Sequence, residues 1–347
     1  MSGSGRFTVV VTSDRYGNET DGLEVEQGIV AGIDDLEIDL LGRPSTTEDE
    51  LIAAGADADA LCVSTREAVT RRVLEHLPRT KVVSRYGVGL DNVDLDAAAD
   101  AGIVVTHYPG YCTAEVADHA LAMVLALNRR LVEQDRSLRA GAWVEFGPAT
   151  RSILRGPILA LRELTLGIVG FGRIGQAVAE RARPFGLRIL AADPYQEPAT
   201  MEAHGVEPVA LDALLEHADI VTLHCPLTPE TRGLIGSAAL ARMKPSAVLV
   251  NTARGPLIDL PALAAALESG RLAGAGIDVT DPEPLPAGSP FYAMENVILT
   301  PHSAYYSERS VETVRRETLL EAVQVLRGKR PRTVATPAVL DRVHLEP

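Results

Sequence analysis

The stretch TLGIVGFGRIG, residues 165–175, decides the fold that this sequence predicts. Its apolar first half predicts a buried β-strand, and the residues that follow it have a helical pattern. Between them Gly170, Gly172 and Gly175 match G-x-G-x-x-G. Gly170 permits a tight turn, Gly172 lets backbone approach a pyrophosphate, and Gly175 lets helix and strand pack closely. Because a helix N-terminus also favours phosphate charge, the stretch predicts a dinucleotide site rather than an ordinary strand–turn–helix.

Asp193 extends this prediction, since it follows the next apolar run, 18 residues beyond Gly175 (193 − 175 = 18). A carboxylate in that place accepts hydrogen bonds from ribose hydroxyls and repels a 2′-phosphate. Pro194 and Tyr195 come next and carry no positive charge, so the pattern favours NAD over NADP. The alternative is that Asp193 only caps the turn before Pro194. The other turn residues assigned to the cofactor are Arg173 and Ile174.

Alternating strand-like and helical runs extend this α/β pattern over most of the chain. Strands are expected at 7–11, 60–63, 81–84, 103–106, 165–170, 187–192, 220–224, 248–251, 274–279 and 296–300. Helices are expected at 66–77, 113–131, 173–185, 211–217, 237–243, 260–269 and 307–328. In the helix at 113–131, Thr113 is the expected N-cap. The fold class predicted is α/β, with two Rossmann-like, doubly wound parallel-sheet domains.

Composition restricts the partners of the protein. A chain of 347 residues is long enough for about two domains. Lys and Arg total 33 and Asp and Glu total 47, so the net charge of −14 disfavours direct binding to nucleic acid or an anionic membrane. The longest strongly apolar helical run, 120–127, is shorter than the roughly 20 residues that span a bilayer. No membrane or nucleic-acid partner is therefore expected.

Cysteine and histidine usage gives no sign of a metal site. The three cysteines, Cys62, Cys112 and Cys225, form no C-x-x-C pair, and the histidines show no ligand spacing. Neither a zinc ribbon nor a disulfide framework is expected, and sparse cysteines fit a reducing cytoplasm.

Several polar residues follow expected strands, where parallel sheets bind ligands. Arg254 suits a carboxylate, although a surface arginine is the alternative. His224 and His302 both follow apolar strands, and spacing does not say which is catalytic. In the segment Gly87-Val88-Gly89, consecutive amides offer an anion nest, although a plain turn is the alternative.

Taken together, six stretches resemble the D-isomer-specific 2-hydroxyacid dehydrogenase family, in order along almost the whole chain. They are YGVGLDNVD at 86–94, the glycine turn at 170–175, HCPLT at 224–228, NTARG at 251–255, GIDVTDPEP at 276–284 and TPHSA at 300–304. Residues 193–195 and 302–308 look most like the C-terminal-binding-protein branch, which includes corepressors that retain a dehydrogenase site.

The resemblance implies two domains around a cleft. Residues 1–110 and 304–347 would form a discontinuous, flavodoxin-like substrate domain, and residues 111–303 the NAD-binding domain. It also implies a homodimer, formed through residues 113–155.

The resemblance further implies an NAD-dependent oxidoreductase that interconverts a D-2-hydroxy acid and its 2-keto acid. His302 would be the general acid/base, Glu283 its partner and Arg254 the group that binds substrate. Further residues matched to the cofactor site are Thr113, His224, Cys225, Pro226, Thr231, Thr252, Ala253 and Asp278. Those matched to the substrate site are Tyr86, Gly87, Val88, Gly89 and Tyr305.

Two departures leave the substrate open. His107 stands where many relatives have Asn before the Pro-Gly turn, and Tyr305 where corepressor relatives have Trp. The alternative function is an NAD(H)-responsive, corepressor-like protein that binds peptides. A formate dehydrogenase is disfavoured because that branch pairs its histidine with glutamine where this chain has Glu283. A long-form phosphoglycerate dehydrogenase is disfavoured because little sequence follows the last expected helix.

Overall fold

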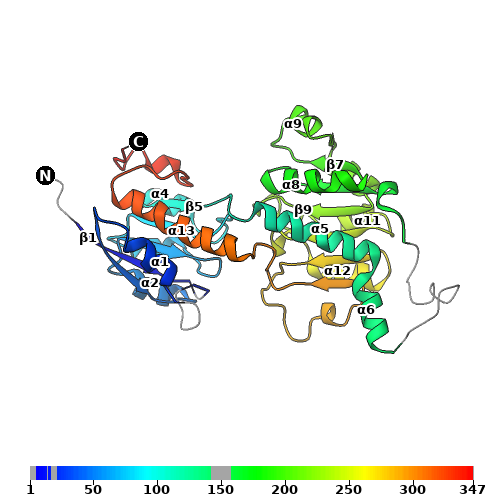
Figure 1. Cartoon of the computed structure of the whole chain (residues 1–347), viewed down its shortest axis with the longest axis horizontal. Coiled ribbons are helices and arrows are strands. Elements are labelled where there is room, and N and C mark those ends of the chain that lie inside the picture. Colours follow the sequence, from blue (N-terminus) through cyan, green and yellow to red (C-terminus); the bar gives the residue numbers. More distant parts are fainter. Residues whose placement is uncertain (1–4, 14, 17–21, 142–157, 347) are drawn as a thin grey trace. The chain divides into compact units, whose positions relative to one another are not determined.

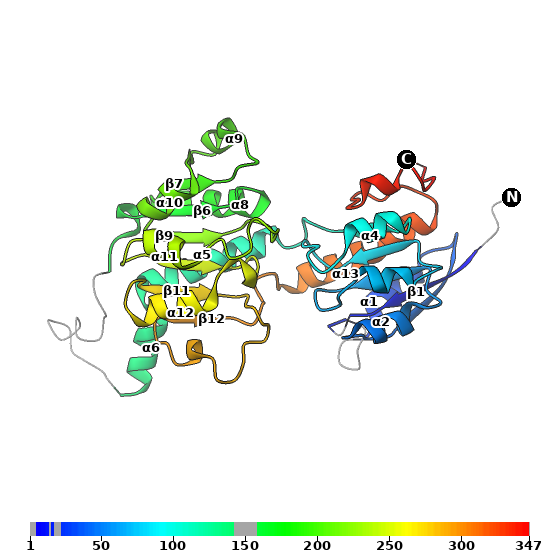
Figure 2. The same ribbon diagram turned by 180° about the vertical axis from the view of Figure 1, so that it is seen from behind.

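The computed structural model describes residues 5–13, 15–16, 22–141 and 158–346. The chain divides into two compact units, one formed by Met1–Tyr111 with Ser307–Pro347 and the other by Cys112–Tyr306 (Figures 1 and 2). The first unit is therefore discontinuous, and the chain ends in it after passing through the second.

The first unit is built on a five-stranded parallel sheet with the order β2-β1-β3-β4-β5. This is the flavodoxin-like strand order. The strands are β1 (Arg6–Val11), β2 (Glu37–Gly42), β3 (Ala60–Val63), β4 (Val82–Arg85) and β5 (Val104–His107). The helices are α1 (Glu24–Val30), α2 (Glu48–Gly55), α3 (Arg71–Glu75), α4 (Leu95–Asp100) and α13 (Glu308–Leu326).

Successive strand residues face opposite sides of this sheet, which gives it two cores. On one side Val9 and Val11 pack with Val314 and Val323 of α13. On the other side Val10 belongs to a cluster that includes residues of α2, α3 and α4. The helix near the end of the chain, orange in Figure 1, thus completes a core begun by the first strand.

The second unit is built on a seven-stranded parallel sheet with the order β12-β11-β10-β9-β6-β7-β8. The strands are β6 (Thr165–Val169), β7 (Arg188–Ala192), β8 (Glu207–Pro208), β9 (Ile220–Leu223), β10 (Val248–Asn251), β11 (Gly274–Ile277) and β12 (Val297–Leu299). Strand addition reverses between β6 and β9. In open α/β sheets the ligand crevice lies outside the carboxyl ends of strands at such a switch point.

Helices cover both faces of this second sheet (Figures 1 and 2). The helices are α5 (Thr113–Arg129), α6 (Leu131–Arg139), α8 (Arg173–Ala182), α9 (Pro198–Ala203), α10 (Leu211–His217), α11 (Ser237–Arg242) and α12 (Leu260–Glu268). One core contains residues of α5 and α8, and the other contains residues of α10, α11 and α12. These findings confirm the predicted fold class. No helix in the described part of the chain has the length and apolarity to cross a membrane.

Two of the expected helices differ in their bounds for reasons that the structure shows. The helix expected at 66–77 begins only at Arg71, because Val69 forms a parallel bridge with Val93 and Thr70 caps the helix. The helix expected at 113–131 ends at Arg129, because Arg130 adopts a left-handed φ of 53° and separates α5 from α6. The expected N-cap, Thr113, was wrong, since Cys112 holds that position and Thr113 is the first helical residue.

Candidate functional site

The candidate site follows the carboxyl ends of neighbouring strands in the second sheet. The glycine turn follows β6 and His224 follows β9, while Arg254, Glu283 and His302 come after β10, β11 and β12. These five strands are consecutive in the sheet order, so their carboxyl ends form one continuous edge. This edge brings together residues that lie up to 132 positions apart (302 − 170 = 132).

The three glycines of the turn serve different purposes. Gly170 has a φ of 89°, and a Cβ there would lie 2.5 Å from the amide nitrogen of Cys225. A Cβ on Gly175 would lie 2.2 Å from the carbonyl oxygen of Gly170. A Cβ on Gly172 would meet no atom within 4 Å, and Gly172 is the N-cap of the ten-residue helix α8. Open space at a helix N-terminus fits a pyrophosphate.

Asp193 ties the glycine turn to the end of β7. Its Oδ2 accepts a hydrogen bond from the amide of Phe171 at 2.7 Å, and its Oδ1 accepts one from the amide of Tyr195 at 2.8 Å. The carboxylate thus caps the turn at Pro194, as the alternative hypothesis for Asp193 predicted. It also braces the turn after β6. An ionised carboxylate has about four acceptor positions, so these two bonds leave capacity for ribose hydroxyls.

His224 is unsuited to acid–base work near neutral pH. The residue is partly buried with its Nδ1 atom fully covered, and this burial lowers its pKa to about 3. Its Nε2 pairs with Oγ1 of Thr222 at 2.9 Å, while its Nδ1 is buried without a hydrogen-bond partner among the described residues. A second proton would bury an unpaired N–H. Of the two candidates that sequence spacing left open, His224 is therefore a neutral, structural histidine.

Other expected cofactor residues line the same edge. Burial raises the pKa of the Cys225 thiol to about 11, which keeps it protonated. Thr231 donates its hydroxyl to the carbonyl of Pro226 at 2.7 Å and so holds the loop after β9. The hydroxyl of Thr252, just after β10, is buried and has no partner in the described structure. Because buried polar groups are normally hydrogen-bonded, this hydroxyl is available to bond to a ligand.

Asn251, the last residue of β10, fixes the loop that carries Arg254. Its Oδ1 accepts from the amide of Ala253 at 3.0 Å, and its Nδ2 donates to the carbonyl of Arg254 at 2.8 Å. The guanidinium of Arg254 donates to the carbonyl of Ala253 at 2.7 Å. A Cβ on Gly255 would come within 2.1 Å of the backbone of Thr280, so this loop packs tightly against the loop after β11.

His302 and Glu283 form a pair within the second unit. Nδ1 of His302 lies 2.8 Å from Oε1 of Glu283, with side-chain exposures of 17% and 36%. The ring of Tyr305 stands edge-on to the imidazole at 6.2 Å between centroids. With Nδ1 held by the carboxylate, Nε2 is the nitrogen that can exchange a proton with a ligand. Its place after a strand singled out His302, whereas Glu283 and its pairing with His302 came only from the family resemblance.

Asp278 is a fully buried carboxylate that holds the loop after β12. Its Oδ1 accepts from the Thr300 hydroxyl at 2.5 Å and from the Ser303 amide at 2.8 Å. Its Oδ2 accepts from the Ala304 amide at 3.0 Å, and its backbone carbonyl accepts from the amide of His302 at 2.7 Å. Asp278 was predicted as a cofactor residue, whereas its role in holding this loop was missed. Thr300 was also missed, although it begins the quoted stretch TPHSA.

In the first unit, residues 86–89 form a loop whose carbonyl groups are fixed by their surroundings. The carbonyl of Tyr86 accepts from Arg85 Nη1 at 2.7 Å, and that of Gly87 accepts from the Tyr108 amide at 3.1 Å. Nδ1 of His107 lies 2.8 Å from the carbonyl oxygen of Val88. No described residue accepts from the amides of 87–89. The loop can therefore present these donors to an anion.

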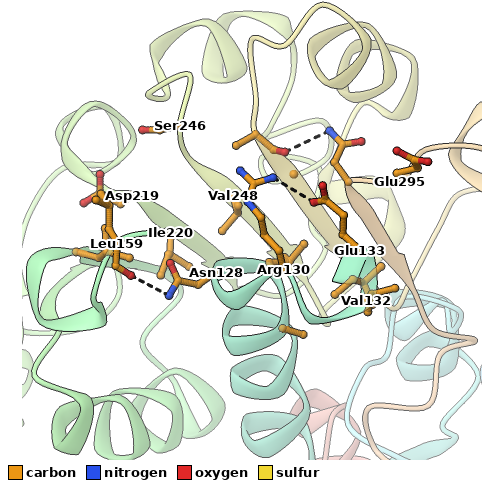
Figure 3. Close-up of a pocket in the computed structure, with 17 residues that line it drawn as sticks. Asn128, Arg130, Val132, Glu133, Leu159, Asp219, Ile220, Ser246, Val248 and Glu295 are labelled. Carbon is orange, nitrogen blue, oxygen red and sulfur yellow. Dashed lines mark hydrogen bonds and ion pairs between the residues drawn. The ribbon is translucent and has the colours of Figure 1, made fainter. Parts of the chain in front are cut away.

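A pocket in the second unit lies away from this site. Its lining includes Asp219, Ile220 and Val248, at the amino-terminal ends of β9 and β10, together with Arg130 and Glu133 of the α5–α6 region (Figure 3). The glycine turn and His302 follow the opposite ends of their strands. Within the described residues no group of His, Cys, Asp and Glu could hold a metal ion.

Comparison with known proteins finds relatives over most of the chain. The family model "D-isomer specific 2-hydroxyacid dehydrogenase, NAD binding domain" matches residues 121–304. A D-3-phosphoglycerate dehydrogenase of Mycobacterium leprae is 43% identical over 280 residues, which cover 80% of this chain and 51% of that protein. The chain thus spans about half the length of that relative. A glyoxylate reductase of Korarchaeum cryptofilum is 42% identical over 285 residues, which cover 82% and 84% of the two chains.

Solved structures agree with these relatives. The TT0316 protein from Thermus thermophilus superimposes with a TM-score of 0.80 at 39% identity, covering 94% of this chain and 99% of that one. A D-lactate dehydrogenase from Aquifex aeolicus, solved with NAD and lactic acid, gives a TM-score of 0.77 at 29% identity, covering 92% and 96%.

Proposed function

Since the chain belongs to the D-isomer specific 2-hydroxyacid dehydrogenase family, we propose that it is an NAD-dependent oxidoreductase that interconverts a D-2-hydroxy acid and its 2-keto acid. The observation that carries the proposal is the pairing of His302 with Glu283 at 2.8 Å on the sheet edge that also bears Arg254. Reduction of a keto acid needs a group that delivers a proton to the carbonyl oxygen and a cation that stabilises negative charge on it, and this sheet edge carries both.

The residues present fit NAD. Gly172 offers open space at the start of α8, Asp193 offers acceptors for the ribose, and Thr252 offers an unpartnered hydroxyl. The carboxylate of Asp193 disfavours the 2′-phosphate of NADP. When bound, the nicotinamide would donate a hydride to the substrate carbon as NADH and accept one from it as NAD⁺.

The side chains supply the proton and the charge. In reduction, Nε2 of His302 gives a proton to the carbonyl oxygen, while Glu283 orients the ring and stabilises the imidazolium form before the transfer. In oxidation, the same nitrogen takes the proton from the hydroxyl. Arg254 binds the substrate carboxylate and stabilises negative charge on the reacting oxygen. The amides of residues 87–89 are proposed as further carboxylate donors, and Tyr305 as a substrate contact beside His302.

A direct test measures NADH oxidation with glyoxylate, pyruvate, hydroxypyruvate and 3-phosphohydroxypyruvate. We expect turnover of at least one, and His302→Ala should lower kcat by about 10²–10⁴-fold while NADH still binds. The matched control is His217→Ala, since His217 is exposed on α10, away from this edge. No turnover of any keto acid, or an active His302→Ala enzyme, would refute the proposal.

Residues 193–195 and 302–308 resemble C-terminal-binding proteins, and from this we keep only the hypothesis that the chain lies in that branch of the family. The relatives reported above are reductases and dehydrogenases by name. A corepressor-like role would predict tight NADH binding without turnover in the same assay.

The assembly is proposed to be a homodimer in the cytoplasm. Sparse cysteines support the compartment. Leu131 and Leu138 of α6 support the dimer, because these two large apolar residues are 54% and 40% exposed.

A further inference from the structure

His119 connects helix α5 to the loop that carries His302. It lies one and a half turns into α5, and its Nε2 is 3.1 Å from Oγ1 of Thr300, the residue that follows β12. The two residues are 181 positions apart in the sequence. His119 is absent from the motifs that carry the family resemblance, and no residue of the glycine turn or of the acid–base pair hydrogen-bonds to it in the described structure.

Donors and acceptors fix the direction of this contact. An ionised carboxylate only accepts, so the Thr300 hydroxyl must donate its one proton to Asp278 Oδ1, at 2.5 Å. The oxygen of Thr300 then accepts the hydrogen bond from His119. His119 must therefore carry a proton on Nε2. The hydrogen bonds thus run in series from His119 through Thr300 to Asp278. Nε2 of His119 also lies 3.9 Å from Oδ1 of Asp278, and this proximity adds electrostatic attraction when the imidazole is charged.

Asp278 in turn holds the loop after β12, which carries His302. Its two carboxylate oxygens accept from the amides of Ser303 and Ala304, the residues directly after His302. His302 itself adopts a φ of 53°, a conformation that a residue with a side chain holds only when its surroundings impose it. Because Asp278 is completely buried, the orientation of its carboxylate depends on the few donors around it.

We infer that His119 is a positioning residue for the proposed reaction. By donating from Nε2 to Thr300, it sets the direction of the Thr300–Asp278 hydrogen bond, and Asp278 in turn holds the backbone that aims His302. The inference rests on the proposed function, in which His302 transfers the proton. It predicts that His119 affects kcat and not the binding of NADH or keto acid.

A double-mutant cycle tests this connection. His119→Leu removes the donor and Thr300→Val removes the hydroxyl at similar volume. Each should lower kcat by about tenfold, and the double variant should also lose about tenfold, because residues of one network are not additive. KM for the keto acid and Kd for NADH should change by less than about threefold. Losses that multiply to about a hundredfold in the double variant would overturn the inference.

Rescue and control variants separate positioning from packing. His119→Gln places an amide N–H at similar reach, so it should recover most of the kcat that His119→Leu loses. His217→Leu, on α10, makes the same chemical change at an exposed histidine that bonds only within its own helix, and it should leave kcat unchanged. If His119→Gln is as slow as His119→Leu, the hydrogen bond is not the cause.

A readout independent of activity distinguishes this inference from the proposed function. ¹H–¹⁵N spectra of ¹⁵N-histidine-labelled protein, assigned with His119→Gln, report which ring nitrogens of His119 carry protons. A proton on Nε2 is the expected result. A neutral ring protonated only on Nδ1 would overturn the inference even in an active enzyme. Absence of turnover with a proton on Nε2 would instead refute the proposed function.

Discussion

Gly172 and Gly175 belong to one motif, yet the packing of the structure requires glycine only at Gly175. A side chain at Gly175 would collide with the carbonyl oxygen of Gly170, whereas a side chain at Gly172 would enter empty space. Gly175 is thus required by folding, and we propose that Gly172 is required by the pyrophosphate of the cofactor. The motif alone predicts both glycines without separating these roles.

We therefore expect Gly172→Ala to keep its melting temperature and lose NADH affinity by tenfold or more, because the methyl group takes the space of the pyrophosphate. Gly175→Ala should instead be destabilised by about 1–3 kcal/mol through overpacking. Thermal unfolding and NADH fluorescence titration measure the two effects. Equal NADH affinity in Gly172→Ala and wild type would contradict the assignment of this turn.

His224 should make stability depend on pH. Its pKa is about 3 in the folded protein, against 6.5 for a free histidine. Between these values the unfolded chain binds a proton that the folded protein does not, so its stabilising contribution is complete above pH 6.5 and declines as the pH falls toward 3. At 1.36 kcal/mol per pH unit, lowering the pH from 6.5 to 5 costs about 2 kcal/mol.

Urea unfolding at both pH values measures this cost, and His224→Gln, which does not titrate, is the comparison. We expect wild type to lose about 2 kcal/mol more than the variant. An equal loss in both proteins would mean that His224 is protonated in the folded state.

At the scale of elements, a buried ion pair joins the first helix to the last. Glu26 of α1 and Arg315 of α13 are both almost fully buried, with Arg315 Nε 2.9 Å from Glu26 Oε1. The hydroxyl of Tyr86 donates to the same oxygen at 3.3 Å, and Tyr86 begins the loop of amides at 87–89. Burial raises the pKa of Tyr86 well above its usual value. The pair thus supports both the helix contact and this loop.

Removing one partner should leave the other charge buried without compensation. We expect Glu26→Leu to destabilise the protein by about 3–5 kcal/mol, and Glu26→Leu with Arg315→Leu to be less destabilised than the single variant. The matched control is Asp39→Ala, which breaks an exposed pair with Arg6 in the same unit and should change little. Denaturant unfolding compares the three. A double variant less stable than Glu26→Leu would contradict this account.

Regular periodicity in the sequence predicted β3, α10 and β10 with the bounds that the structure has. Seven elements were not predicted, namely α1, β2, α2, α4, α6, α9 and β8. In β2 every residue is partly or fully exposed, since it lies at the edge of its sheet, and such a strand has no continuous apolar run. The short helices α1 and α4 depend on packing against the sheet rather than on their own propensity.

At the scale of the whole molecule, the proposed homodimer predicts a mass in solution of twice 36.9 kDa. Leu131→Asp with Leu138→Asp should produce monomers, because charges would enter an apolar contact. Phe185→Asp is the control, as Phe185 is 41% exposed on another surface of the second unit. Size-exclusion chromatography with light scattering gives the masses. A dimer that survives the double substitution, or a monomeric wild type, would contradict the proposed interface.

The sequence by itself determined the parallel α/β class, the dinucleotide turn and the residues placed at strand ends, because these depend on local periodicity and on short motifs. Spacing along the sequence did not separate the two candidate histidines, and the family resemblance assigned His302; the tertiary structure adds the physical reason, since burial makes His224 neutral while Glu283 lies beside His302. It alone connected His119 to Thr300, because a hydrogen bond across 181 residues leaves no trace in local sequence. Desolvation and long-range hydrogen bonding arise only when distant segments pack together, which is why the folded chain decides them.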